Sequence, residues 1–267
     1  MPAADGMAAR FGRYTMRATL DRVNPPKVIA TDLDRTLLRT DGSTSARTRA
    51  ALDLAMERGV HVIAVTARPI RWLDRLAPAF GRLPHVIASN GAACYDLAAA
   101  LAYDLRPFEA ATLPELLAAM RTALPAARFA LETPTGMLRE PEYVLSPLKI
   151  VVADRERHSA AMFAEALPAV GTLAHLTYST HRGLLELGPP AVTKASTLAA
   201  WCAARGIDAA DVVAFGDMPN DVPMLRWAGR SWAVANADEQ VKAAASGITA
   251  SNDEDGVARV VEEFFLS

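Results

Sequence analysis

The first patterned stretch of the chain alternates short apolar runs with helical spacing. Val28-Ile29-Ala30-Thr31 is a largely β-branched apolar run that ends in Asp32-Leu33-Asp34, which predicts a buried strand followed by a polar loop. The hydroxyl side chains at 43–45 are candidate N-caps for a helix that Gly59 ends. The same alternation then predicts a strand over 60–65, a helix over about 69–80 and a strand over 85–88.

The C-terminal part of the chain shows the same alternation. It predicts helices at about 193–204, 221–227, 237–245 and 254–265, with strands over 211–215 and 231–235 between them. Fully apolar strands separated by helices favour a parallel sheet that helices cover on both faces. We therefore expect an α/β protein with a Rossmann-like core.

Between these two blocks, residues 91–186 show a different pattern, with hairpin-like runs, isolated helices and turn formers such as Thr133-Pro134-Thr135-Gly136. We expect an inserted α+β domain here. Its connections are predicted where Gly and Pro interrupt the pattern, near Asn90-Gly91 and Gly188-Pro189-Pro190. The core would then consist of 27–90 and 187–267, and residues 1–26 are interpreted as a flexible N-terminal tail.

Charge and composition exclude several classes of partner. The net charge is −2, so there is no basic excess to attract nucleic acid or acidic lipid, and neither partner is expected. Residues 1–26 contain several Arg and no continuous apolar stretch, so neither a secretory signal nor a transmembrane helix is predicted there. Cys94 and Cys202 have no metal-ligand spacing and are interpreted as buried thiols, which is consistent with a cytoplasmic location.

Polar residues follow several of the predicted strands. In an open parallel sheet, ligands bind beyond the carboxyl ends of the strands. The candidates at these positions are Asp32, Asp34, Thr66, Asn90, Asp217, Asn220 and Asp221. Carboxylate oxygens suit Mg²⁺, which keeps part of its water shell and needs only two or three such ligands with a substrate phosphate. A second Asp-x-Asp pair, Asp253 and Asp255, follows polar residues and is interpreted as a solvated helix N-terminus.

These segments carry a resemblance to a known family. The motifs are Asp32-Leu33-Asp34-Arg35-Thr36-Leu37-Leu38, Val65-Thr66-Ala67-Arg68-Pro69, Ser89-Asn90-Gly91-Ala92, Thr193-Lys194-Ala195 and Gly216-Asp217-Met218-Pro219-Asn220-Asp221-Val222-Pro223-Met224-Leu225. In their order they resemble the haloacid dehalogenase (HAD) superfamily, and more narrowly its Cof-type branch with the class IIB cap. The resemblance covers about 27–267, and its last motif is the most specific.

The resemblance implies a role for each matching position. Asp32 would attack phosphorus to form an aspartyl-phosphate, and Asp34 would protonate the leaving oxygen and then activate water. Contacts to the phosphate or substrate would come from Thr66, Ala67, Asn90, Lys194 and Asn220. Mg²⁺ would be held by Asp32, Asp217 and the backbone carbonyl of Asp34, with Asp221 in support. The implied activity is hydrolysis of a small phosphorylated metabolite, such as a sugar phosphate, beneath the inserted cap.

Two positions depart from the family pattern, since Arg35 and Ala67 stand where the family usually has Gly. If the loop requires a positive φ at residue 35, a side chain there costs about 1 kcal/mol or more. Arg35 thus leaves an alternative open, in which catalysis is weakened and the protein binds a phosphate ligand in a regulatory role. Phosphoryl transfer to a sugar, as in a phosphomutase, is the other alternative. Arg68 fits either a surface ion pair or a role in the site. The sequence specifies neither the physiological substrate nor the oligomeric state.

Overall fold

The computed structural model describes residues 24–73, 83, 85–139 and 146–265. Most of the predicted N-terminal tail, 1–23, lies outside the described residues, as does the larger part of the helix predicted over 69–80. Within that predicted helix the described residues form one short turn, Ile70–Trp72. Among the described residues, no helix combines the length and apolar character needed to cross a lipid bilayer.

A large sheet of eight strands forms the centre of the protein, in the order β13-β12-β11-β1-β2-β3-β4-β5. All pairings from β13 to β3 are parallel, as predicted, whereas β3 with β4 and β4 with β5 are antiparallel. The strands are β1 (Val28–Thr31), β2 (His61–Val65), β3 (His85–Ala88), β4 (Ala93–Asp96), β5 (Leu101–Tyr103), β11 (Val212–Gly216), β12 (Arg230–Ala233) and β13 (Gly247–Ile248).

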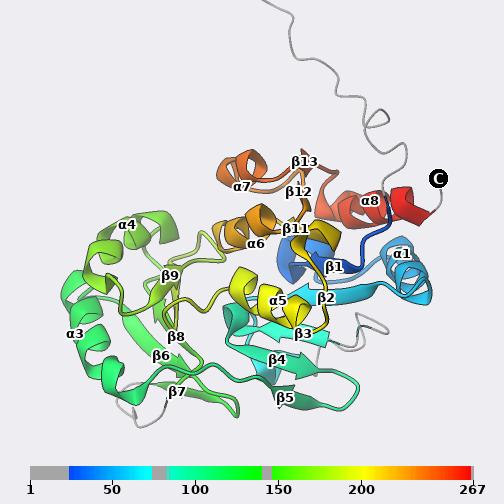
Figure 1. Cartoon of the computed structure of the whole chain (residues 1–267). Coiled ribbons are helices and arrows are strands. Elements are labelled where there is room, and N and C mark those ends of the chain that lie inside the picture. Colours follow the sequence, from blue (N-terminus) through cyan, green and yellow to red (C-terminus); the bar gives the residue numbers. More distant parts are fainter. Residues whose placement is uncertain (1–23, 74–82, 84, 140–145, 266–267) are drawn as a thin grey trace, which may run out of the picture.

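Helices cover both faces of the large sheet (Figure 1). Alternate residues of β1 belong to two different hydrophobic clusters, because successive side chains of a strand point to opposite faces. Ile29 packs with α1 and α8, whereas Val28 and Ala30 pack with α5, α6 and α7. These helices are α1 (Ala46–Glu57), α5 (Lys194–Ala203), α6 (Val222–Trp227), α7 (Glu239–Ala244) and α8 (Gly256–Phe265). The predicted α/β class with a covered parallel sheet is confirmed.

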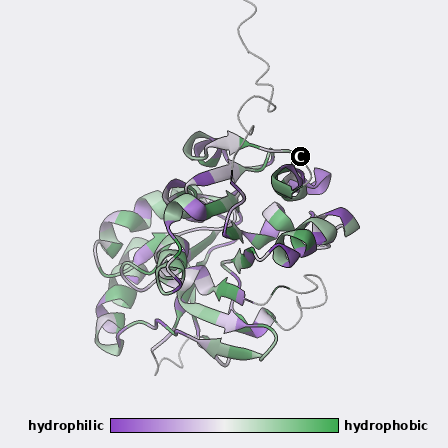
Figure 2. Cartoon of the chain, turned by 45° about the vertical axis from the view of Figure 1, so that its right-hand side comes forward, coloured by the Kyte–Doolittle hydropathy of each residue, from purple (hydrophilic) through white to green (hydrophobic). Residues whose placement is uncertain are grey.

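A second, antiparallel sheet lies beside the large one, in the order β7-β6-β8-β10-β9 (Figure 1). Its strands and helices are α3 (Leu113–Ala123), β6 (Arg128–Glu132), β7 (Met137–Arg139), β8 (Lys149–Ala153), α4 (Ser159–Val170), β9 (His175–Thr177) and β10 (Leu184–Gly188). We call residues 113–188 the smaller unit. In Figure 2 its helices carry both hydrophobic and hydrophilic stretches, as expected for helices that cover a sheet on one side.

The strands β4 and β5 join the large sheet although they follow Asn90-Gly91, where the sequence pattern placed the start of the insert. Each pairs backwards on the preceding strand, so the chain extends the sheet by antiparallel strands before it leaves for the smaller unit. On this basis we propose that the insert begins after β5. The return connection falls after β10, next to the predicted position at Gly188.

Candidate active site

The first strand delivers Asp32 to the carboxyl edge of the large sheet. Asp32 follows β1 directly and is buried, while Leu33 turns into the core. A wide turn follows, in which the amide of Leu37 donates to the carbonyl of Asp32 at 3.3 Å and that of Leu38 donates to the carbonyl of Leu33 at 2.8 Å. The wide turn allows Thr36 to reach back to the site, where its hydroxyl donates to Asp217 at 3.0 Å.

Arg35 lies within this turn in the left-handed region, at φ 62° and ψ 9°. Residue 35 therefore does have the positive φ considered in the sequence analysis. This conformation costs a non-glycine residue about 1 kcal/mol. Asn236 stabilises it by donating to the carbonyl of Arg35 at 2.8 Å. The Arg35 side chain is exposed, and its charge is one of the weaker influences that lower the pKa of Asp217.

Lys194 approaches Asp32 from the start of α5. Thr193 caps this helix, and its side chain and that of Ser196 bond reciprocally to each other's backbone amides at 3.0 and 2.9 Å. The Lys194 ammonium, only 1% exposed, donates to Asp32 at 2.5 Å and to Asp221 at 2.6 Å. Burial lowers the pKa of Lys194, but the charges of Asp221 and Asp32 outweigh burial and raise it above its ordinary value. Lys194 is therefore a permanent cation in the site.

The loop after β11 supplies the other carboxylates. Asp221 accepts from Lys194 through one oxygen and from the amides of Asp217 and Met218, both at 3.0 Å, through the other. This arrangement requires Gly216, because a Cβ at that position would lie 2.5 Å from the Asp221 side chain. With both oxygens bonded, Asp221 is suited to orient Lys194 rather than to bind a ligand.

The carboxylates outnumber the cation. Ligand oxygens of Asp32, Asp217 and Asp221 lie within 4.8 Å of one another, and among the described residues Lys194 is the cation that bonds directly to this group. Burial, with Asp221 and Asp217 nearby, raises the pKa of Asp32 well above its usual range despite Lys194. Burial and Asp221 raise the pKa of Asp217 to about 7. This buried, oxygen-rich and negatively charged set could hold a divalent cation.

A turn after β2 places Thr66 next to the loop after β3. The Thr66 hydroxyl accepts from the amide of Arg68 at 3.0 Å, and its carbonyl accepts from the amide of Asn90 at 3.0 Å. Asn90 lies in the left-handed region at φ 56°, a conformation that Asn adopts more readily than most residues. Asn220 donates to the Asn90 side chain at 3.0 Å and so links this loop to the one after β11.

Asp34 does not point into the cluster with Asp32. Its carboxylate is 52% exposed and bonds to both sides of the Arg68 guanidinium, at 2.5 and 2.7 Å. The two interpretations of Arg68 that the sequence left open therefore coincide: it forms an ion pair, and its partner is a candidate catalytic residue. The pair lies at the rim of the site, where solvent weakens the attraction.

The structure thus places carboxylate oxygens of Asp32, Asp217 and Asp221 within 4.8 Å of one another, bonds Lys194 to Asp32 and Asp221, and links Asn90 to Asn220. It places Asp34 and the Thr66 turn, with Ala67, around them. Sequence reasoning assigned no role to Thr36, although its place two residues after Asp34 was a usable signal. It also overlooked Lys149, whose ammonium donates to the Ala67 carbonyl at 2.7 Å. A lone Lys inside the apolar run Leu148-Lys149-Ile150-Val151-Val152 was the available signal.

A family model for haloacid dehalogenase-like hydrolases matches residues 29–142 and 132–261, which together span most of the chain and all of this site. The chain belongs to this family. It is an enzyme, a HAD phosphatase of the Cof type, as the sequence motifs indicated.

Two named relatives match along nearly their whole length. A phosphoglycolate phosphatase from Halobacterium salinarum is 28% identical over 247 residues, covering 91% of this chain and 98% of that protein. The 5-amino-6-(5-phospho-D-ribitylamino)uracil phosphatase YwtE from Bacillus subtilis is 25% identical over 282 residues, covering 89% and 97%. The structure of the HAD subclass IIB sugar phosphatase BT4131 superposes with a TM-score of 0.75 at 21% identity, covering 90% of this chain and 100% of that one. The last comparison supports the fold.

Proposed function

We propose that this protein is a Mg²⁺-dependent phosphatase that hydrolyses a small phosphorylated metabolite through an aspartyl-phosphate on Asp32. The observation that carries the proposal is the Asp32 cluster, by which we mean Asp32, Asp217, Asp221 and Lys194. In this cluster the Lys194 ammonium, which Asp221 holds in place, contacts the Asp32 carboxylate at the edge of the sheet where ligands bind. A carboxylate beside a phosphate needs such a cation to offset charge repulsion.

In the first step, a carboxylate oxygen of Asp32 attacks phosphorus, and the bond to the leaving oxygen breaks with its electron pair. Asp34 in its acid form donates a proton to that oxygen. In the second step, Asp34 takes a proton from water, the water oxygen attacks phosphorus, and the bond to Asp32 breaks. Inorganic phosphate and the free Asp32 carboxylate result, so atoms and charges balance.

Phosphate oxygens are bound by Lys194, by the Thr66 hydroxyl and by the Ala67 amide, with Asn90 and Asn220 shaping the adjoining wall. The donor set fits Mg²⁺, because the surplus of buried carboxylates around Asp217 is what a hard cation neutralises. Asp32, Asp217 and the Asp34 carbonyl would hold it, and when bound it would offset negative charge on the phosphate. Asp221 keeps Lys194 aimed at Asp32.

In the structure Asp34 is paired with Arg68, so to serve as the acid it leaves Arg68 and takes up a proton from solvent. Its carboxylate is 52% exposed, so solvent can reach it and the side chain is free to turn away from Arg68. Arg68 then becomes available to the anionic substrate. The exposure of Asp34 at the rim of the site supports its acid/base role.

The substrate class rests on the smaller unit and on the relatives. The smaller unit packs against the site, since Met218, which follows Asp217, belongs to its hydrophobic cluster. A covered site favours a small leaving group and limits access of bulk water. The two sequence relatives act, by their names, on phosphoglycolate and on a phosphorylated ribityl compound, both small metabolites.

The test is release of phosphate from para-nitrophenyl phosphate, measured with Mg²⁺, with EDTA, and with Mg²⁺ restored. Asp32→Asn should lower turnover by at least about a thousandfold, because a neutral amide is a poor nucleophile. Asp253→Asn is the matched control, since Asp253 belongs to the other Asp-x-Asp pair and is exposed. Its turnover should equal that of the wild type.

Absence of turnover on this compound and on a panel of sugar phosphates, together with tight binding of phosphate, would instead favour the regulatory alternative. The positive φ at Arg35 is the observation on which that alternative stands. Transfer of the phosphoryl group to an added sugar in place of water would favour the phosphomutase alternative.

A further inference from the structure

The second sheet has one apolar and one charged face. Along β8 the side chains of Ile150 and Val152 enter the hydrophobic cluster beneath α3 and α4. Lys149 alternates with them and therefore points to the other face. On the neighbouring strand Glu186 stands opposite Val151, two residues from Lys149, and so shares that face. The face is turned toward the large sheet, because Lys149 bonds to the loop after β2.

Lys149 and Glu186, which we call the Lys149 pair, are both buried, at 3% and 2% exposure. The ammonium donates to Glu186 at 2.5 Å and to the Ala67 carbonyl at 2.7 Å. Burial raises the pKa of Glu186, but the charge and hydrogen bond of Lys149, together with hydrogen bonds from Ser179 and Asn90, outweigh burial and lower it. The pair is thus ionised and balanced in charge. A buried pair is weak evidence for a gain in stability, so its contact with Ala67 is the more informative feature.

Ala67 lies in the turn that presents Thr66, and the structure anchors each carbonyl of that turn. The Thr66 carbonyl accepts from Asn90, the Arg68 carbonyl accepts from Ser89 at 2.9 Å, and the Ala67 carbonyl accepts from Lys149. The first two donors are backbone amides of the large unit. Only the third donor comes from the smaller unit.

The Ala67 carbonyl and the Arg68 amide belong to one planar peptide and point to opposite sides of it. Fixing that carbonyl on Lys149 therefore fixes the Arg68 amide, which donates to the Thr66 hydroxyl oxygen at 3.0 Å. Once its oxygen accepts this bond, the hydroxyl can direct its own proton to another acceptor. A rotation of the peptide would break both contacts together.

We propose that Lys149, held by Glu186, is a positioning residue that fixes the peptide between Ala67 and Arg68 and so orients the Thr66 hydroxyl toward a phosphoryl oxygen. The inference rests on the proposed phosphatase function and deepens it. Lys149 itself touches neither phosphate nor leaving group. It couples the seating of the smaller unit to the geometry of the phosphate site.

The test compares Lys149→Met with the double variant Lys149→Met/Glu186→Gln. The single variant leaves Glu186 as an unbalanced buried charge, so it loses stability for a purely structural reason. The double variant removes both charges and should recover thermal stability, but Ala67 still lacks its donor. We expect both variants to raise the inhibition constant of inorganic phosphate, and to lower kcat/KM for para-nitrophenyl phosphate, by about tenfold. Lys149→Arg, which keeps a donor, should restore part of each.

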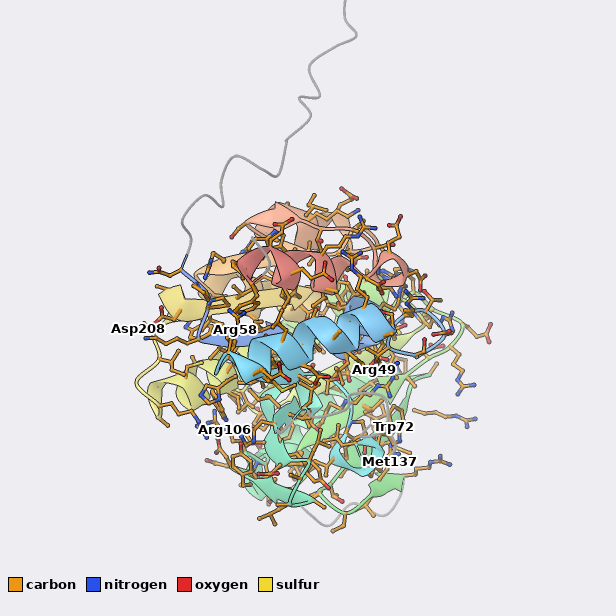
Figure 3. The ribbon with its side chains drawn as sticks, turned by 90° about the vertical axis from the view of Figure 1, so that its right-hand side faces the viewer. Arg49, Arg58, Trp72, Arg106, Met137 and Asp208 are labelled. Atoms are coloured by element: carbon orange, nitrogen blue, oxygen red, sulfur yellow. The ribbon has the colours of Figure 1, made fainter. Side chains whose placement is uncertain are left out.

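Inorganic phosphate is the decisive probe because it has no leaving group and does not report lost contacts between the smaller unit and a substrate. The matched control is Arg71→Met/Glu132→Gln. Arg71 of the large unit pairs with Glu132 of the smaller unit at 2.7 Å. Figure 3 labels two residues near this ion pair, Trp72 in the large unit and Met137 in the smaller unit. This ion pair also joins the two units but does not contact Ala67, so its loss should leave phosphate inhibition unchanged.

Wild-type phosphate affinity and kcat/KM in the stable double variant would overturn the positioning role and leave the phosphatase proposal intact. An equal loss of phosphate affinity in the control double variant would also overturn it, because general seating of the smaller unit would then explain the effect. If the single variant does not fold, the double variant and Lys149→Arg decide the question. Absence of turnover in the wild type would contradict the phosphatase proposal itself.

Discussion

The two buried lysines of this protein lie in opposite electrostatic settings. In the Asp32 cluster, Lys194 faces three carboxylates, and burial raises the pKa of Asp217 to about 7. In the Lys149 pair, one ammonium meets one carboxylate, and the pKa of Glu186 is lowered. The excess negative charge of the Asp32 cluster favours binding of a further cation, whereas the Lys149 pair is already neutral. The contrast in charge distinguishes the Asp32 cluster, which is suited to bind ligands, from the Lys149 pair, which is suited to hold the Ala67 carbonyl in place.

The largest expected loss of kcat/KM comes from removing Lys194, and removing Lys149 is the comparison. Lys194→Met takes the only cation from the Asp32 cluster and should lower kcat/KM by at least about a thousandfold. Lys149→Met should lower it by about tenfold, since it acts through one peptide. The comparison is made on para-nitrophenyl phosphate at saturating Mg²⁺. Equal losses would mean that the two sites are not functionally distinct.

Gly216→Ala tests whether the geometry of the Asp32 cluster depends on close packing. The added Cβ would meet the Asp221 side chain at 2.5 to 2.8 Å, so Asp221 must shift and release Lys194. We expect kcat to fall by about a hundredfold and the protein to lose roughly 1 to 3 kcal/mol of stability. Gly136→Ala is the control, because nothing lies within 4 Å of its added Cβ. Denaturant unfolding and steady-state kinetics measure both effects.

Arg35→Gly should have a smaller effect. Glycine adopts the positive φ of this position without strain, so the variant should gain up to about 1 kcal/mol in the free energy of unfolding. Because the Arg35 side chain is exposed, we expect turnover to change by less than about threefold. A rise of an order of magnitude would show instead that Arg35 suppresses activity, as the regulatory alternative requires.

The smallest effect concerns acid stability. Glu186 has a folded pKa below its ordinary value of 4.5, so its contribution to stability is present above about pH 4.5 and is lost as pH falls through the folded pKa. As the pH falls below that value, the unfolding free energy of the wild type should therefore decrease relative to that of Lys149→Met/Glu186→Gln. Denaturant unfolding at a series of pH values measures it. A difference that is independent of pH would contradict an ionised pair.

The sequence predicted the elements whose signals are local. The strand at Val28–Thr31 and the helix that follows Ser45 were recognisable because apolar spacing and caps are encoded within a few residues. The strands β4 and β5 were assigned to the insert, since nothing local distinguishes antiparallel extension of a sheet from the start of a new domain. The two-residue strand β13 is too short to carry a pattern.

The site was predictable to the extent that its residues follow strands. The placement of Asp32, Asp217 and Lys194 around one point agrees with the prediction from strand ends and motifs. The Asp34 side chain turns to Arg68 because a guanidinium offers two matched donors, which no spacing rule contains. Lys149 contacts a carbonyl 82 residues away in sequence, and such a contact exists only once both sheets have formed.

The central claim is that Asp32 carries the phosphoryl group during turnover. Turnover of para-nitrophenyl phosphate is quenched with acid, the protein is treated with borohydride, which reduces an acyl phosphate to an alcohol, and its peptides are analysed by mass spectrometry. We expect homoserine at position 32 in the wild type and in Asp253→Asn, and none without substrate. Reduction at another carboxylate, or active turnover with no reduction at position 32, would contradict the central claim.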